Sequence, residues 1–331
     1  MTDQAQRFFR SPVFWVVTAP LSFLFGLLVS IRNLLYDFRI LKTHQVGVPV
    51  ISVGNISTGG SGKTILIQSL AKFFLENGRT PAILSRGYGR KTSGLQIVAD
   101  AKNVIGSVRA SGDEPYMMAI NLPGVPVVVS EDRVSGAEYI EKNFSVDVIL
   151  LDDGFQHRRL HRDLDILLQD NSGLVVPRLL PWGDLREGPG SVRRADVILK
   201  SKSQSVEGSD DEFKLAAPSK LVNHSGKPVG IEVLASGFGL FAGLGNNEAF
   251  FRFAEDAIGP PVLTVSLPDH SEYSEGDLRR IPLNECPVWV TTQKDMIKLS
   301  ASMCETHHVY YLGVKGELPA VLLGALKHYL K

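Results

Sequence analysis

The segment VPVISVGNISTGGSGKT at residues 48–64 decides the fold, because it joins an apolar run to a glycine-rich turn and then to Gly-Lys-Thr. A strand that ends in such a turn and continues as a helix holds nucleotide phosphates with backbone N–H groups and the positive end of the helix. Lys63 would reach the β- and γ-phosphates, and the Thr64 hydroxyl would bind Mg²⁺. The segment therefore predicts a nucleotide-binding domain.

The loop departs from the full phosphate-loop pattern at its first position, where Ser57 replaces the usual glycine. Its consecutive glycines supply the missing backbone freedom. A glycine-rich loop that only caps a helix is the alternative, and the flanking strand and helix argue against it. The residues that we assign to the nucleotide are Thr58, Gly59, Gly60, Ser61, Gly62, Lys63 and Thr64.

Short apolar strands alternate with helical patterns on the C-terminal side of the loop. We expect strands at 81–85, 126–130, 146–151, 164–169 and 196–200, and helices at 65–77 and 134–142. This alternation predicts an α/β fold of the P-loop NTPase type, with a mostly parallel sheet covered by helices on both faces.

The polar stretch at 201–211 reads as a loop or boundary, and a second set of elements follows it. We expect strands at 228–234, 262–266, 288–292 and 309–312, and helices at 250–258 and 320–329. A chain of 331 residues is also long for one core. We therefore expect an N-terminal helical segment at 1–45, a P-loop domain at 46–215 and a smaller α/β domain at 216–331.

Composition excludes some classes of partner. The 35 basic and 35 acidic residues cancel, so the charge gives no sign of nucleic-acid binding. The two cysteines fit no metal or redox spacing and are expected to be free thiols in a reducing compartment. No protein partner is evident.

Residues 11–31 carry no charge and would form a helix of roughly 31 Å, about the thickness of the hydrocarbon layer. A signal peptide is disfavoured because no small-residue cleavage site follows and a phosphate loop needs cytosolic nucleotide. A spanning helix stays open, although Pro12 and Pro20 interrupt the run and cations flank both of its ends.

Residues 31–42 decide between these interpretations, since apolar residues recur there at helical spacing with basic residues between them. This pattern is typical of a helix that lies in a membrane surface. A helix packed on the protein's own core is the alternative. We expect peripheral or monotopic attachment to the cytosolic side of a membrane.

Several polar groups outside the loop are candidates for chemistry. Asp152 and Asp153 end an apolar run, where an acid either holds Mg²⁺ or caps the next turn. Asp113 would be a helix N-cap or the base that accepts a proton from an attacking hydroxyl. Arg186 would neutralise a phosphoryl group or pair with a neighbouring acid. His270 follows a strand beside an aspartate and is a candidate for handling protons.

Taken together, these segments resemble the tetraacyldisaccharide 4'-kinase family, the lipid A kinases of Gram-negative bacteria. The matching pieces occur in the family's order and cover nearly the whole chain. They are Ser52–Asn55 with Gly59–Thr64, Ser85–Gly89, Gly112–Pro115, Asp152–His157, Leu185–Glu187, Phe241–Asn246 and Asp269–His270.

The resemblance implies ATP- and Mg²⁺-dependent phosphorylation of the 4'-hydroxyl of a tetraacylated diglucosamine 1-phosphate. It also implies an N-terminal helix that meets this lipid at the cytoplasmic face of the inner membrane. The residues to which it gives roles are Asp113 as general base with His270, Lys63 and Thr64 at the nucleotide, Asp152 and Asp153 at the metal, Arg186 near the transferred phosphate, and Lys294 in a nucleotide-side element.

Two positions depart from the family pattern. Ile65 and Gly188 stand where proline is usual. Proline at a helix start is dispensable, so we expect little change at Ile65, whereas Gly188 would loosen the turn that aims Arg186.

Other classes of protein fit less well. Partitioning-type ATPase switches on membranes carry a lysine before the paired glycines, where this chain has Thr58. GTP-binding switches need Asn-Lys-x-Asp, but Lys294 and Asp295 are adjacent and no asparagine is in register. A non-enzymatic scaffold would leave the ordered polar segments without a purpose.

Overall fold

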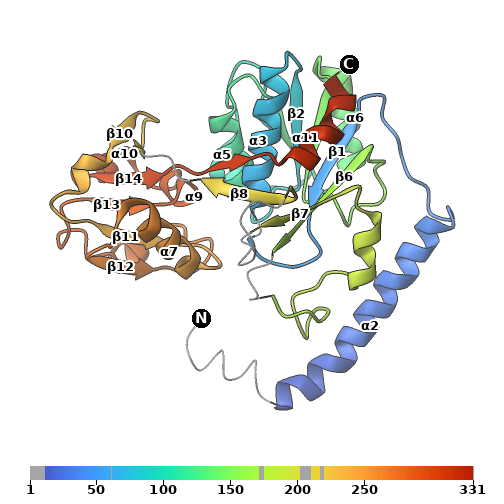
Figure 1. The fold of residues 1–331 in the computed structure, drawn as a ribbon, viewed down its shortest axis with the longest axis horizontal. Helices are drawn as coiled ribbons and strands as arrows, with labels where there is room; N and C mark the ends of the chain where they lie inside the picture. The colour runs from blue at the N-terminus through green and yellow to red at the C-terminus, as the bar shows by residue number, and fades with distance from the viewer. Residues whose placement is uncertain (1–11, 61, 171–174, 202–209, 217–219, 331) are drawn as a thin grey trace.

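The protein is described by a computed structural model that covers residues 12–330, apart from 61, 171–174, 202–209 and 217–219. Its larger sheet has nine strands in the order β15-β8-β7-β6-β1-β5-β2-β4-β3 (Figure 1). The strands are β1 (Val50–Gly54), β2 (Pro81–Ser85), β3 (Gln96–Ala99), β4 (Val127–Val129), β5 (Val148–Asp152), β6 (Leu164–Asp170), β7 (Val197–Ser201), β8 (Glu212–Ala216) and β15 (Lys315–Glu317). All neighbours pair in parallel except β3 with β4 and β15 with β8.

Both faces of this sheet are buried, which explains why its central strands are almost wholly apolar. In β1, Ile51 and Val53 face one hydrophobic cluster while Val50 faces another, because successive side chains point to opposite faces. The first cluster includes α3 (Lys63–Glu76), α5 (Asp113–Asn121) and α11 (Ala320–Leu326), and the second includes α6 (Arg133–Asn143). The predicted α/β fold with helices on both faces is confirmed.

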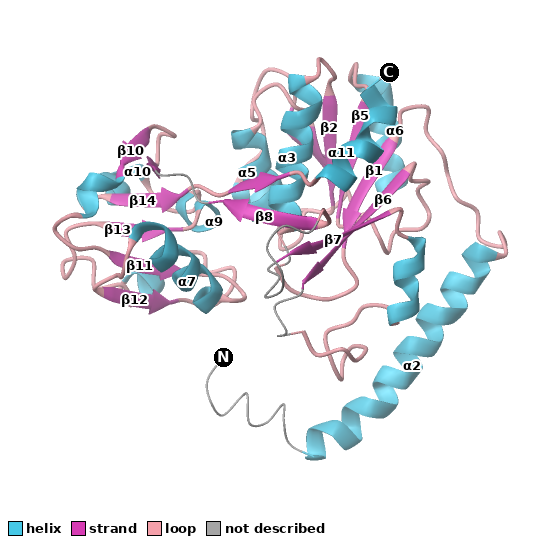
Figure 2. Ribbon diagram, in the orientation of Figure 1, coloured by secondary structure: helices cyan, strands magenta, loops and turns pink. Residues whose placement is uncertain are grey.

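The smaller sheet has six strands in the order β10-β9-β14-β13-β11-β12 (Figure 2). They are β9 (Lys220–Asn223), β10 (Pro228–Gly230), β11 (Gly239–Ala242), β12 (Leu263–Ser266), β13 (Trp289–Thr291) and β14 (Val309–Leu312). Its helices are α7 (Asn247–Ile258), α8 (Glu275–Leu278), α9 (Gln293–Met296) and α10 (Ala301–Thr306). Two further clusters fill its faces, one around Leu240 and Phe251 and one around Phe241 and Trp289.

The chain returns from the smaller sheet to the larger one at its end. β15 pairs with β8, and α11 lies beside the larger sheet (Figure 1). Leu322 and Leu326 of α11 belong to the core of that sheet. The helix expected at 320–329 is α11 followed by a 3₁₀ helix, η3 (Lys327–Leu330), and it packs on the larger sheet instead of the smaller one. The domain limits 1–45, 46–215 and 216–331 stay a prediction.

The N-terminal helix α2 (Pro12–Asp37) is continuous through Pro20 and lies at the edge of the molecule (Figure 1). Its outer side is apolar and open: Phe23 is 75% exposed and Leu28 is 60% exposed. This is the one candidate membrane span among the described residues by length and composition, over Thr18–Asp37, and on those grounds alone it is weak support for membrane association.

Local structure differs from the sequence predictions in four further places. The helical pattern expected through residue 42 stops at Asp37, because Arg39 adopts a positive φ of 57° that no helix continues through. The strand expected at 228–234 is β10 followed by a 3₁₀ helix, η2 (Ile231–Leu234). The short helices α4 (Val108–Ser111) and η1 (Pro189–Arg194) were not expected.

Candidate active site

The phosphate loop follows β1 at the carboxyl end of the larger sheet and leads directly into α3. Gly62 is the N-cap of α3 with a φ of 92°, and Gly59 has a φ of 106°, a region that favours glycine. A Cβ added at Gly59 or Gly60 would meet nothing within 4 Å, so the loop stays open above the backbone. Ser61, which we predicted to bind nucleotide, lies outside the described residues.

A second segment runs beside this loop. The backbone N–H of Thr58 donates to the Asp184 carbonyl at 2.8 Å, and the N–H of Arg186 donates to the Ile56 carbonyl at 2.7 Å. Ser57 and Leu185 form an antiparallel bridge between these two hydrogen bonds. We call residues 184–187 the bridging segment. Its backbone pairing with residues 56–58 places Arg186 beside the phosphate loop.

Lys63 and Arg186 converge on Asp153. The ammonium of Lys63 lies 3.4 Å from Asp153 Oδ1, and Arg186 Nη1 donates to Asp153 Oδ2 at 2.6 Å. Burial acts to raise the pKa of Asp153, but the two cations outweigh it and hold the pKa below its usual range. Asp153 is therefore ionised at neutral pH and holds both cations beside the loop.

Asp152 lies in a more apolar setting at the end of β5. Its Oδ2 accepts a hydrogen bond from the Ser85 hydroxyl at 2.9 Å, and its Oδ1 is buried without a hydrogen-bond partner. Burial raises the pKa of Asp152 to about 7, and the charges of Glu114 and Asp153 add to the increase. Excess negative charge at a buried carboxylate is what a divalent cation would neutralise.

The residues at this corner fit the predicted Mg²⁺. The Thr64 hydroxyl donates to Glu114 Oε2 at 3.1 Å, so the loop threonine and a third carboxylate lie beside the two aspartates. Within the described part of the chain, no three His, Cys, Asp or Glu side chains form a ready-made cage. Mg²⁺ needs none, because it usually keeps waters and phosphate oxygens and takes only one or two carboxylates.

Asp113 belongs to the part of the chain that contains the larger sheet and His270 to the part that contains the smaller one, and the two side chains meet at this site. Asp113 is the first residue of α5, and His270 lies in the turn after β12 with a φ of 57°. His270 Nδ1 lies 3.0 Å from Asp113 Oδ2. Asp113 caps nothing by its side chain, since Gly112 is the N-cap of α5, so its carboxylate is directed into the site.

A third group at Asp113 was missed in the sequence. The Lys298 ammonium is almost fully buried and lies 2.7 Å from Asp113 Oδ2, and it also donates to the Ser271 carbonyl at 3.1 Å. Burial acts to raise the pKa of Asp113, but hydrogen bonds from His270 and Lys298 outweigh it and lower the pKa. The carboxylate is therefore ready to accept a proton.

Lys294 also lies on the second sheet's side of the site. Its ammonium is 3.4 Å from Asp269 Oδ1, one residue before His270, and its charge contributes to lowering the pKa of Asp113. The structure thus places it near the Asp113–His270 pair. Its contact with a nucleotide stays a prediction.

The other predicted site residues lie together around the phosphate loop. Besides Lys298, two residues next to them, Ser85 and Glu114, were not predicted. We assigned no function to Ser85 or to Glu114 from the sequence. Both follow from position alone: Ser85 ends β2 beside β5, and Glu114 follows Asp113 at the start of α5. For Ser85 the signal is the carboxyl-end rule for parallel sheets, and for Glu114 it is only the position next to Asp113.

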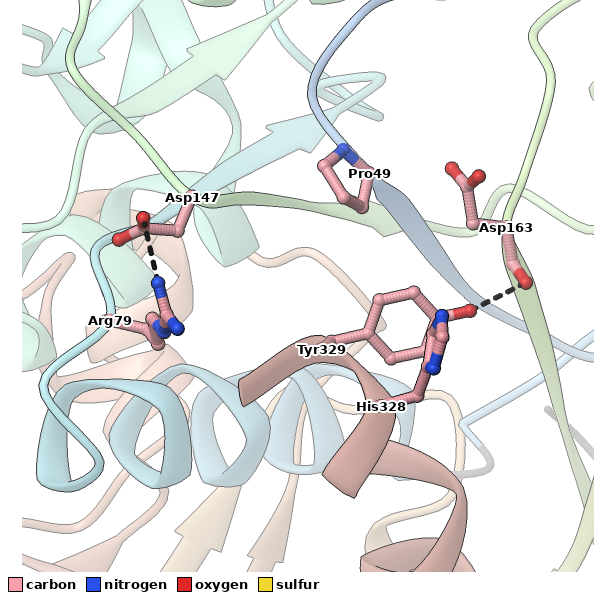
Figure 3. Close-up of a pocket in the computed structure, with 6 residues that line it drawn as sticks. All are labelled: Pro49, Arg79, Asp147, Asp163, His328 and Tyr329. Carbon is pink, nitrogen blue, oxygen red and sulfur yellow. Dashed lines mark hydrogen bonds and ion pairs between the residues drawn. The ribbon is translucent and has the colours of Figure 1, made fainter. Parts of the chain in front are cut away.

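A cavity lies at the opposite, amino end of the sheet (Figure 3). It is lined by residues that precede β1, β2, β5 and β6 and by residues of η3: Pro49, Arg79, Asp147, Asp163, His328 and Tyr329. Arg79 pairs with Asp147, and the Tyr329 hydroxyl donates to the Asp163 carbonyl at 2.7 Å (Figure 3). Arg79 also donates to the Leu330 carbonyl at 2.6 Å, so Arg79 and the Tyr329 hydroxyl fix the C-terminal helix to the sheet, away from the phosphate loop.

Comparison with known proteins identifies the family. A family model described as tetraacyldisaccharide-1-P 4'-kinase (LpxK) matches residues 14–331. The tetraacyldisaccharide 4'-kinase of Aquifex aeolicus is 41% identical over 290 residues, which cover 85% of this chain and 88% of that protein. The enzyme of Chlorobaculum tepidum is 35% identical over 340 residues, which cover 92% and 93%.

A solved structure agrees with these relatives. It is described as the "apo" form of LpxK from Aquifex aeolicus in complex with ATP, and it is 38% identical to this chain. It superposes with a TM-score of 0.80 and covers 94% of this chain and 98% of its own. The chain belongs to the tetraacyldisaccharide 4'-kinase family.

Proposed function

We propose that this protein transfers the γ-phosphoryl group of ATP to the 4'-hydroxyl of a tetraacyldisaccharide 1-phosphate in lipid A biosynthesis. Family membership supports the substrates, and the ATP named for the Aquifex aeolicus structure supports the donor. The observation that carries the chemistry is the contact between Asp113 and His270, one residue from Glu114, which accepts a hydrogen bond from Thr64 of the phosphate loop.

Asp113 would act as general base. Its carboxylate accepts the proton of the sugar hydroxyl as the hydroxyl oxygen attacks the γ-phosphorus, and the bond from that phosphorus to the β–γ bridging oxygen breaks to release ADP. His270 and Lys298 hold the carboxylate ionised and aimed at the acceptor. Both partners belong to the part of the chain that contains the smaller sheet, so Asp113 has both of them only when the two parts are in contact.

The donor side is built from the larger sheet. The loop backbone and Lys63 would hold the β- and γ-phosphates, and Arg186 would neutralise charge on the group in transfer. Thr64, Asp152 and Asp153 would hold Mg²⁺, which neutralises phosphate charge when it is bound. Asp153 pairs with both Lys63 and Arg186 and would hold these two cations beside the phosphates.

The acceptor lipid also explains the exposed apolar helix. A substrate with four acyl chains stays in the bilayer, so the enzyme has to reach it at the membrane surface. The open side of α2 would lie in the cytoplasmic face of the inner membrane as a peripheral or monotopic anchor.

The test is direct. Purified protein is incubated with ATP, Mg²⁺ and tetraacyl disaccharide 1-phosphate, and mass spectrometry follows the lipid. We expect a bisphosphorylated product that disappears in Asp113→Asn and is absent without Mg²⁺. ATP hydrolysis that membranes stimulate without any lipid product would contradict the proposal and favour a membrane-surface ATPase switch.

A further inference from the structure

Glu187 is a fully buried carboxylate that follows Arg186 in the bridging segment. Its Oε1 accepts a hydrogen bond from Arg32 Nη2 of α2 at 3.0 Å, and its Oε2 pairs with Arg194 Nη2 at 2.7 Å. A buried carboxylate needs such partners, because an unpaired buried charge is strongly destabilising. Glu187 therefore fastens the last part of α2 to the segment that carries Arg186.

The bridging segment has the phosphate loop on its other side. Its backbone hydrogen bonds to Ile56 and Thr58 run along the loop, and Arg186 reaches Asp153 from it. One short segment thus contacts the N-terminal helix through Glu187 and the nucleotide site through the residues before it.

The loop that follows Asp152 and Asp153 rests on the same part of α2. The Arg158 guanidinium donates to the Asn33 carbonyl at 2.9 Å and to Asp37 Oδ1 at 2.7 Å. Arg194, the second partner of Glu187, lies over the Phe155 ring at 4.5 Å from its centroid. The end of α2 therefore supports both loops that supply charged groups to the site.

We propose that Arg32 is a positioning residue for the nucleotide site. Its ion pair with Glu187 holds the bridging segment, and with it Arg186 and the phosphate loop, in the arrangement that binds ATP. This inference rests on the proposed function, because it takes ATP as the ligand. The apolar outer side of α2 serves the membrane, while its last turns serve the nucleotide.

Arg32→Ala tests the proposal without endangering the fold, since the Arg32 side chain is 40% exposed and Glu187 keeps Arg194 as a partner. ATP binding to the full-length protein in detergent is measured by calorimetry, with Mg²⁺ and without lipid substrate. We expect Kd to rise by about fivefold, because a charged hydrogen bond of partly screened strength is lost. In assays, KM for ATP rises and KM for the lipid stays the same.

Lys42→Ala is the matched control. It removes one cation from the stretch just after α2, but Lys42 is exposed and has no ion pair in the described structure. ATP affinity is expected to stay at the wild-type value. Arg32→Lys keeps the charge and is expected to recover part of the loss.

The outcomes separate this inference from the proposed function. Wild-type protein that binds no ATP would refute the proposed function itself. Wild-type binding with an unchanged Kd in Arg32→Ala would overturn only the positioning role, as would an equal loss in Lys42→Ala. Glu187→Gln supplies a second check: adding Arg32→Ala to it should cause no further loss, and fully additive losses would contradict the pair.

Discussion

Replacing Lys298 by methionine is the sharpest test of the proton-accepting site. Methionine keeps the length and apolar packing of the side chain but removes the cation 2.7 Å from Asp113 Oδ2. Lys298 and Asp113 are 6% and 13% exposed at their side chains, so solvent screens their interaction only weakly. The pair should therefore contribute at the level of a charged hydrogen bond.

The size of the effect follows from that contribution. Hydrogen bonds to charged groups contribute about 1.5–3 kcal/mol, and about 1.4 kcal/mol corresponds to one pKa unit. Loss of Lys298 should therefore raise the pKa of Asp113. The base works only when it is ionised. The lowered pKa of Asp113 therefore preserves activity in acid in the wild type, and the variant should lose its activity at a higher pH when the pH is lowered.

The assay measures kcat/KM for the lipid as a function of pH. ATP and Mg²⁺ are kept saturating so that the titration of the carboxylates at the metal site does not affect the profile. We expect the acid limb of Lys298→Met to move upward by about one to two pH units. Lys294→Met is the control, because Lys294 acts on Asp113 by charge without a direct hydrogen bond and should cause a smaller shift. An acid limb that coincides with the wild type, in a variant with normal thermal stability, would refute the reasoning.

Three further predictions concern the rest of the site and the helix. Asp113→Asn and His270→Ala should each lower kcat by about 10²–10⁴-fold, and the double variant should lose little more than the worse single one; fully additive losses in single-turnover assays would argue against a working pair. Burial raises the pKa of Asp152 to about 7, so the affinity for Mg²⁺–ATP, measured by calorimetry, should increase about tenfold from pH 6 to 8. Asp152→Asn should show no such pH dependence, and an equal pH dependence of the affinity in the two proteins would contradict a metal role. Glutamate in place of Phe23 and Leu27 should stop the protein from floating with anionic vesicles while ATP binding persists, and undiminished flotation would exclude this side of α2 as the anchor.

The parallel strands β1, β2, β4, β5, β6 and β7 of the larger sheet could be predicted because their signals are local, whereas β3, β8 and β15 were not predicted. The run at 48–64 contains the strand, the turn and the helix start in one stretch, and buried parallel strands are apolar throughout. The return of α11 could not be predicted in this way. Its apolar pattern indicates a helix, but the pairing of β15 with β8 decides which sheet it covers, and that pairing is non-local.

The site shows the same division. Asp113 and His270 are 157 residues apart, so the residues alone left Asp113 open between a helix cap and a base, and only the resemblance paired them. Lys298 belongs to no motif and looks like any surface lysine until the fold buries it against Asp113. The end of α2 was placed too late because the apolar and basic alternation continues past Asp37, whereas the backbone turns at Arg39.

The contacts that join the two sheets at the site are polar, and this bears on how the enzyme would work. Asp113 meets His270 and Lys298, and Asn121 of α5 exchanges hydrogen bonds with Gln293 of α9. The hydrophobic clusters of the two sheets, by contrast, are separate. Polar contacts can be exchanged for contacts with water, whereas a shared hydrophobic core could not, so we expect the two parts to open for the lipid headgroup and to close around it. Because Asp113 has its two partners only in the closed arrangement, the base would be most effective when water is excluded, which favours transfer to the sugar over hydrolysis of ATP.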